Sequence, residues 1–189
     1  MAGAANLARQ ARALFAACIL SFSGVAYAQC ADPLALEPEF GAFAFTQTRH
    51  LSGVRAPLVS RGQAIVAQGS VDWRVTSPLD IRTQITASGI TQSIEGGAPQ
   101  RLGGQGDAFL ASAGLLQLLS GDLASLANHY NIAPTRAPSG WRVRLTPKSE
   151  NAARFILYIE AGGCERVARV EVRQANGDWM EIALSPAGD

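Results

Sequence analysis

The residues of this chain that could carry out acid–base chemistry are few. The sequence contains two histidines, His50 and His129, and no glycine-x-serine-x-glycine motif that would expose a nucleophilic serine. A serine–histidine–acid set would have to combine His129, Asp122 and one of several serines. Asp122 is better placed to cap a helix, because its side chain can accept from free backbone N–H groups. We therefore expect no enzyme, and an acyl-substrate hydrolase is the least favoured alternative.

Metal and nucleotide sites have no better support. No pair of histidines or carboxylates has the spacing of metal ligands. The segment Gly103-Gly104-Gln105-Gly106 is glycine-rich like a phosphate loop, but it lacks the lysine and the parallel-sheet context. We interpret it as a hinge, and we expect neither a cofactor nor a metal.

The first 28 residues have the pattern of a secretory signal. Arg9 and Arg12 precede the apolar run 13–20, and Ala-Tyr-Ala at 26–28 provides the small residues that signal peptidase requires. The run is shorter than the roughly 20 apolar residues that span a bilayer. We place cleavage after Ala28 and expect the periplasm; a retained anchor is the alternative.

Cleavage of the leader would also remove Cys18, leaving Cys30 and Cys164 as the cysteines of the mature chain. Two cysteines in an oxidising compartment favour one disulfide, with two separate thiols as the alternative. Lipidation of Cys30 is a further alternative, but bacterial lipoproteins need a small residue before that cysteine, and Gln29 occupies the position.

Residues 29–189 have the length of one domain. Because the leader carries two arginines and no acidic residue, the net charge falls from +1 to about −1. This balance gives no reason to expect nucleic acid or an anionic membrane surface as a partner. Nearly half of the residues are apolar, which excludes a disordered chain.

Period-two alternation dominates the remaining chain, as in strands with one buried and one wet face. The apolar positions of the predicted strands are Phe43 and Phe45; Val71, Trp73 and Val75; Leu79, Ile81 and Ile85; Trp141, Val143 and Leu145; Phe155, Leu157 and Ile159; Ala168, Val170 and Val172; and Met180, Ile182 and Leu184. The turn-forming residues between these strands predict hairpins. Asn176-Gly177 predicts a two-residue turn with positive φ at both positions, and Gly96-Gly97 and Gly162-Gly163 predict further turns.

Helical spacing replaces the alternation over residues 107–130. Leu110, Ala113, Gly114 and Gln117 mark one stripe, which Leu115, Leu116, Leu118 and Leu119 widen. Gly121 can end this first helix and Asp122 can cap a second, with Leu123, Leu126, Ala127 and Tyr130 on one face. A shorter helix is expected within residues 33–40.

These elements predict a mainly β (α+β) protein of about ten strands. Successive strands this close together must be antiparallel, and a sheet this long must curl. We expect an incomplete β-barrel whose concave face is covered by a helical lid.

The order of the motifs resembles the LolA family of lipoprotein carriers, including its LolB-like relatives. The resemblance rests on residues 43–49 (Phe-Ala-Phe-Thr-Gln-Thr-Arg), 57–62 (Pro-Leu-Val-Ser-Arg-Gly), 71–78 (Val-Asp-Trp-Arg-Val-Thr-Ser-Pro), 118–122, 130–132, 141–147 and the Asn176-Gly177 hairpin. It implies an incomplete eleven-stranded barrel with a helical lid, and a cavity that shields lipoprotein acyl chains in the periplasm. In the main family members an arginine before the tryptophan strand holds the lid closed. Here Ala67-Gln68-Gly69-Ser70 lacks it, which indicates a divergent member, serving a different lipid or glycolipid pathway.

Acyl chains need buried apolar area rather than converging polar groups. We expect cavity contacts from Phe43, Phe45, Trp73, Ile81 and Leu145, and lid contacts from Leu115, Leu116, Leu119 and Leu123. The alternative is that these residues form a filled core, as in a non-catalytic periplasmic adaptor. Arg49, Arg55 and Arg61 could contact an anionic head group or a delivery partner, or simply form a solvated face.

The carrier interpretation also sets the expected partners. They are an acylated lipoprotein or lipid cargo, an inner-membrane donor complex and an outer-membrane acceptor, and no nucleic acid. We expect the carrier to act as a monomer.

Overall fold

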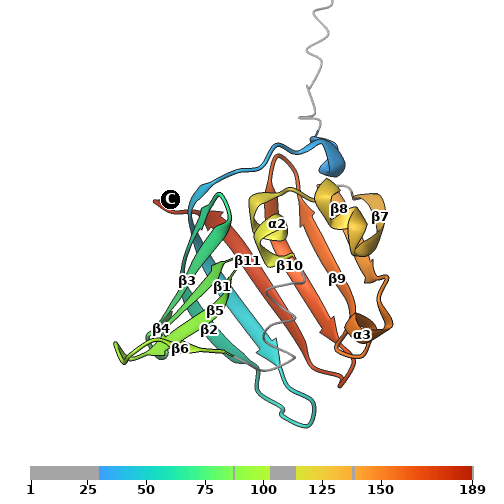
Figure 1. Ribbon diagram of the computed structural model, residues 1–189. Coiled ribbons are helices and arrows are strands. Elements are labelled where there is room, and N and C mark those ends of the chain that lie inside the picture. The colour runs from blue at the N-terminus through green and yellow to red at the C-terminus, as the bar shows by residue number, and fades with distance from the viewer. Residues whose placement is uncertain (1–29, 87, 103–113, 138, 189) are drawn as a thin grey trace, which may run out of the picture.

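The computed structural model describes residues 30–86, 88–102, 114–137 and 139–188. The predicted leader, the glycine-rich hinge, and Leu110 and Ala113 of the predicted lid lie outside these ranges. Eleven strands make up most of the described residues, and Figure 1 shows their arrangement. They are β1 Gly41–His50, β2 Leu58–Ala67, β3 Ser70–Ser77, β4 Ile81–Thr86, β5 Gly89–Ile94, β6 Gln100–Arg101, β7 Tyr130–Ala137, β8 Gly140–Pro147, β9 Ile156–Gly163, β10 Val167–Gln174 and β11 Trp179–Pro186.

All eleven strands belong to one antiparallel sheet. Their order is β6-β5-β4-β3-β2-β1-β11-β10-β9-β8-β7, so β1 pairs with β11 and joins the two halves of the chain. The sheet curls strongly, and its edge strands β6 and β7 do not pair with each other in the described chain (Figure 1). The predicted incomplete antiparallel barrel is confirmed.

In most strands, the side chains that alternation predicted to face inward are buried. In β8, Trp141, Val143 and Leu145 are at most 4% exposed, while Arg142 and Arg144 lie on the outer face and bind Glu160. The inner face of β1 begins with buried Phe43 and Phe45. These inward side chains form the hydrophobic core between the sheet and the helices.

Two strands depart from strict alternation because a register shift inserts an extra residue. In β9, the shift at Leu157 turns Ile156 inward, so Phe155 and Leu157 are exposed, against the predicted pattern. In β10, the shift between Val167 and Arg169 exposes Ala168 and buries Val167. Period-two counting fails beyond such a bulge, because the strand faces are exchanged there.

Within the described ranges the helices are short, and the part of the predicted lid before Gly114 lies outside these ranges. The helices are η1 Pro33–Ala35, α2 Leu115–Ser120, η2 Ala124–Asn128 and α3 Glu150–Ala153. Within residues 33–40 only one turn forms, because Pro38 disfavours helical geometry at the residue before it. Gly121 ends α2 with φ +82°, as predicted, and Asp122 accepts from the amide of Ser125 at 3.2 Å.

The second lid helix is a 3₁₀ helix, and Tyr130 does not belong to it. Tyr130 begins β7, where it pairs with Pro147 of β8. Residues 130–137 show no period-two pattern, because Pro134 and neighbouring small or polar residues interrupt it. Proline is tolerated here because β7 is an edge strand of the sheet.

Two predicted turns also differ. Gly162 and Gly163 close β9, and the bend follows at residues 164–166. The β10–β11 connection has positive φ at Gly177 but not at Asn176, and the amide of Gly177 donates to the Gln174 carbonyl. Four residues, 175–178, connect the two strands, and among them only Gly177 uses the left-handed region.

Candidate binding cavity

The concave face of the sheet and helix α2 border an open cavity of about 520 Å³. This volume lies within the range of small-molecule binding sites in proteins. Helix α2 contacts β10 on the inner side of the curled sheet (Figure 1). The sheet's curl and the short helix thus leave space where a filled core would have none.

Most of the cavity wall is apolar. The apolar residues that line it are Leu58, Val59, Trp73, Val75, Pro78, Leu79, Ile81, Ile85, Ile90, Leu102, Leu115, Leu118, Ile159, Val170, Val172, Met180 and Ile182. Of these, Leu58, Val59 and Leu79 are also exposed to solvent, by 55%, 43% and 52%. These three residues join the cavity wall to the solvent-exposed surface.

The polar part of the wall is small. Gln47, Ser60, Thr83 and Gln92 line the cavity, and Gln92 donates to the Thr83 hydroxyl at 3.1 Å. Arg49 is the single charged residue in the wall among the residues that the structure describes. Such a wall can hold an apolar chain and orient one polar end.

The structure divides the five expected cavity residues into two groups. Trp73 and Ile81 line the cavity. Phe43, Phe45 and Leu145 are buried at 5%, 4% and 0% exposure and are not part of its wall. Phe45 lies in a second layer, stacked on Trp73, and Phe43 borders a small separate pocket together with Leu119.

The four expected lid residues are divided in the same way. Leu115 lines the cavity, and Leu116 is half-buried against the core. Leu119 and Leu123 are 4% and 0% exposed, and they are not part of the cavity wall. Leu118, expected on the lid helix without a ligand role, lines the cavity.

Several wall residues were missed by sequence reasoning although their strands were recognised. Val75, Ile85, Val170, Val172, Met180 and Ile182 occupy the inward positions of β3, β4, β10 and β11. Alternation alone could have found them. Ile90 and Gln92 lie on β5, whose sequence has no regular apolar pattern, so no comparable signal identified them.

The residues considered for chemistry lie elsewhere. Neither histidine lines the cavity, and His50 stacks on Trp179 with ring centroids 3.7 Å apart. Asp122 is engaged in the turn with Ser125. Among the residues described, no group of three histidine, cysteine, aspartate or glutamate side chains could hold a metal ion.

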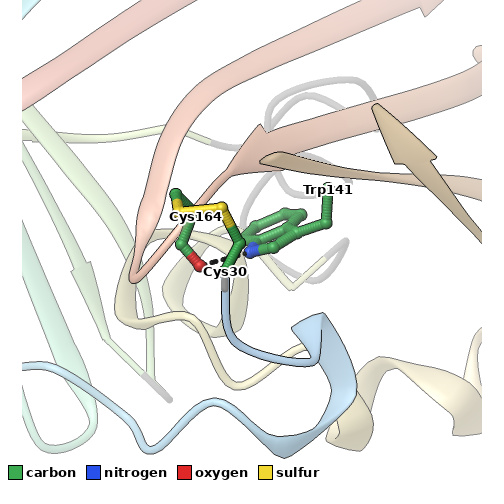
Figure 2. The surroundings of a disulfide bond; sticks show 3 residues. All are labelled: Cys30, Trp141 and Cys164. Carbon is green, nitrogen blue, oxygen red and sulfur yellow. Dashed lines mark hydrogen bonds between the residues drawn. A yellow bond between two sulfur atoms is a disulfide. The ribbon is translucent and has the colours of Figure 1, made fainter. Parts of the chain in front are cut away.

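A disulfide between Cys30 and Cys164 joins the N-terminal segment to the β9–β10 bend, as predicted (Figure 2). The backbone carbonyl of Cys164 accepts two hydrogen bonds, from the indole N–H of Trp141 at 2.8 Å and from the amide of Ala31 at 3.1 Å. The bridge therefore tethers residues 30–40 over one end of the core.

The fold and the cavity define a class of half-barrel proteins with an open apolar interior. Residues 33–189 match the family described as outer membrane lipoprotein carrier protein LolA-like. The chain belongs to this LolA-like family, as its motifs predicted.

Solved structures of similar shape include two with low sequence identity. The LolA superfamily protein NE2245 from Nitrosomonas europaea is 12% identical, with 82% of this chain and 88% of that chain covered and a TM-score of 0.45. The lipoprotein LppX from Mycobacterium tuberculosis is 7% identical, with 77% and 85% covered and a TM-score of 0.40. No curated protein sequence matches the chain.

Membership of this family supports a role in binding or carrying a lipid or a lipoprotein. LolA-like proteins are generally non-catalytic carriers. The disulfide fits an oxidising compartment. Within the described ranges, none of the helices has the length and apolar character needed to cross a membrane.

Proposed function

We propose that this chain is a non-catalytic periplasmic carrier that holds the acyl chains of a lipoprotein or another lipid in its cavity. The observation that carries the proposal is the open cavity of about 520 Å³, whose wall is apolar except for a few polar groups. A protein that served only as an adaptor would gain stability by filling this space. An apolar wall left open to solvent forgoes the free energy of burying that surface, which a bound acyl chain would recover.

The chemistry of the wall suits acyl chains. Burial of each methylene contributes about 0.8 kcal/mol, so ten methylenes contribute roughly 8 kcal/mol before the cost of ordering the chain. The wall residues that would contact the chain include Trp73, Ile81, Val170 and Ile182. Since this attraction is nondirectional, it can hold chains of different length without specific polar contacts.

The proposed route follows from the leader and the disulfide. Residues 1–28 would direct the chain to the periplasm and be removed, leaving residues 29–189 as a single carrier domain. An inner-membrane donor complex would supply the acylated cargo, and an outer-membrane acceptor would receive it. The mature carrier would work as a monomer, since one cavity shields one cargo.

The proposal is tested by native mass spectrometry and lipid extraction on mature protein purified gently from periplasm. Thr83 lines the cavity, and Thr83→Trp should fill it and displace the ligand. Gln84 is the next residue on β4 and is exposed on the other face, so Gln84→Trp is the matched control. We expect co-purifying acylated species with the wild type and Gln84→Trp, and their loss with Thr83→Trp.

One result would overturn the carrier role. If the wild-type protein has a ligand-free mass and also fails to bind added fatty acid or lipoprotein, the cavity does not hold acyl chains. A structural or adaptor role would then be the better account.

A further inference from the structure

The inner face of β1 changes in polarity along its length. Phe43 and Phe45 are buried, Gln47 is half-buried, and Arg49 has a side chain that is 46% exposed. Gln47 and Arg49 both line the cavity, whereas the two phenylalanines lie in the core. The strand therefore runs from an apolar end, near the lid, to a polar end beside the β1–β2 loop.

Arg49 is set among apolar wall residues. In the two neighbouring strands, its partners are Leu58 of β2 and Met180 of β11, and both line the cavity. Gln47, the preceding inward residue of β1, pairs with Ser60 of β2. A guanidinium group thus stands at the border between the apolar wall and solvent, with an amide and a hydroxyl close by.

The hydrogen-bonding capacity of Arg49 is largely unused. Among the described residues its polar partner is Asp178, whose Oδ2 lies 3.9 Å from Nη2, beyond hydrogen-bonding distance. The Oδ1 atom of Asp178 accepts instead from the amide of Ser52 at 2.8 Å. By contrast, Arg74 and Arg144 on the outer face bind carboxylates at 2.7 Å and 3.0 Å.

The other two arginines considered from the sequence do not share this position. Arg61 is exposed on β2 and is absent from the cavity wall, and Arg55 is exposed in the β1–β2 loop. Only Arg49 of the three combines a place in the wall with free donors.

We propose that the ligand is an anionic amphiphile whose carboxylate or phosphate oxygens accept hydrogen bonds from the Arg49 guanidinium while its acyl chain extends along the apolar wall. This inference rests on the proposed carrier function and deepens it by naming the chemistry of the head group. The planar guanidinium presents paired N–H donors that match carboxylate and phosphate oxygens. Gln47 and Ser60 add neutral polar groups beside that anion.

The test compares head groups on one chain length. Binding of palmitate, hexadecyl phosphate and the neutral hexadecanol is measured by displacement of a fluorescent fatty acid from the mature wild-type protein. We expect both anions to bind roughly 5–10-fold more tightly than the alcohol, since a half-exposed charged hydrogen bond contributes modestly. Arg49→Gln should remove this preference by weakening the binding of both anions.

Two further variants isolate the role of position and charge. Arg61→Gln makes the same charge change outside the cavity wall, so it should keep the anion preference. Arg49→Lys keeps the positive charge and should retain part of the preference. Inorganic phosphate at millimolar concentration should not displace palmitate, because a free anion lacks the chain that the apolar wall binds.

The outcomes separate the two proposals. If the wild type binds none of the three amphiphiles, the carrier function itself fails. If it binds all three equally, or if Arg49→Gln keeps the anion preference, the head-group inference fails and the carrier function stands. Displacement of palmitate by phosphate alone would instead identify a simple anion site.

Discussion

The indole ring of Trp73 stacks on the ring of Phe45, with centroids 3.8 Å apart and planes 24° from parallel. Trp73 faces the cavity, whereas Phe45 is 4% exposed and lies behind it. The cavity wall is therefore two layers thick at this point. Phe45 supports a residue of the cavity wall without lining the cavity itself.

Phe45→Ala should lower the free energy of unfolding by about 3–5 kcal/mol, because it leaves a void beneath Trp73. Urea denaturation of the mature protein measures this value. Thr46→Ala changes the neighbouring residue of the same strand, which is only half-buried, and should cost much less. A loss below about 1 kcal/mol for Phe45→Ala would mean that the second layer does not support the wall.

Replacing both Cys30 and Cys164 by serine should lower the free energy of unfolding by about 3–5 kcal/mol. The two cysteines are 134 residues apart, so the bridge removes much freedom from the unfolded chain. Urea denaturation with and without dithiothreitol provides the measurement. The reductant should destabilise the wild type and leave the double variant unchanged; equal stability of all samples would contradict the tether.

Gly62→Ala should destabilise the sheet by more than about 2 kcal/mol, because the added Cβ would collide with a backbone atom. That Cβ would lie 1.9 Å from the carbonyl oxygen of Arg74, at the register shift between β2 and β3. Thermal and urea unfolding would report the loss. Gln63→Ala at the exposed next position should be nearly neutral, and a similarly mild effect at Gly62 would refute the predicted collision.

Stability should decrease at high pH partly through Tyr130. Its side chain is 2% exposed, and burial raises the pKa of its phenol to about 12. The phenol of the unfolded chain ionises near pH 10, so its contribution is complete below that pH and is lost as the pH rises through 12.

The matched comparison is Tyr130→Phe, which removes the ionisable group. Between pH 9 and pH 11.5 the wild type should lose about 2 kcal/mol more stability than Tyr130→Phe, as measured by urea denaturation at each pH. Equal losses in the two proteins would show that the Tyr130 phenol does not ionise differently on folding.

The strand pattern and the cysteine pair were accessible from the sequence because each rests on local rules, whereas the lipid-carrier class rested on the resemblance of the ordered motifs to the LolA family. Alternation in residues 141–146 reports a strand with two different faces, whatever the strand pairs with. The same rule failed at Phe155 and Ala168, since a bulge is created by pairing with a neighbouring strand. It also failed for β7, whose edge position explains how Pro134 fits into a strand.

By itself, the sequence determined that the chain forms a curled antiparallel sheet with a leucine-rich insert and two cysteines available to pair. Only the tertiary structure decided which inward residues touch the cavity and which fill the core. Phe45 and Trp73 both point inward from their strands, yet stacking buries one behind the other. Likewise, alternation places Arg49 on the same face of its strand as Phe43 and Phe45, but only strand pairing sets it between Leu58 and Met180 in the cavity wall. How deeply a side chain is buried in a curved sheet depends on how strands that are far apart in the sequence pack together. Residue type and spacing do not encode that packing.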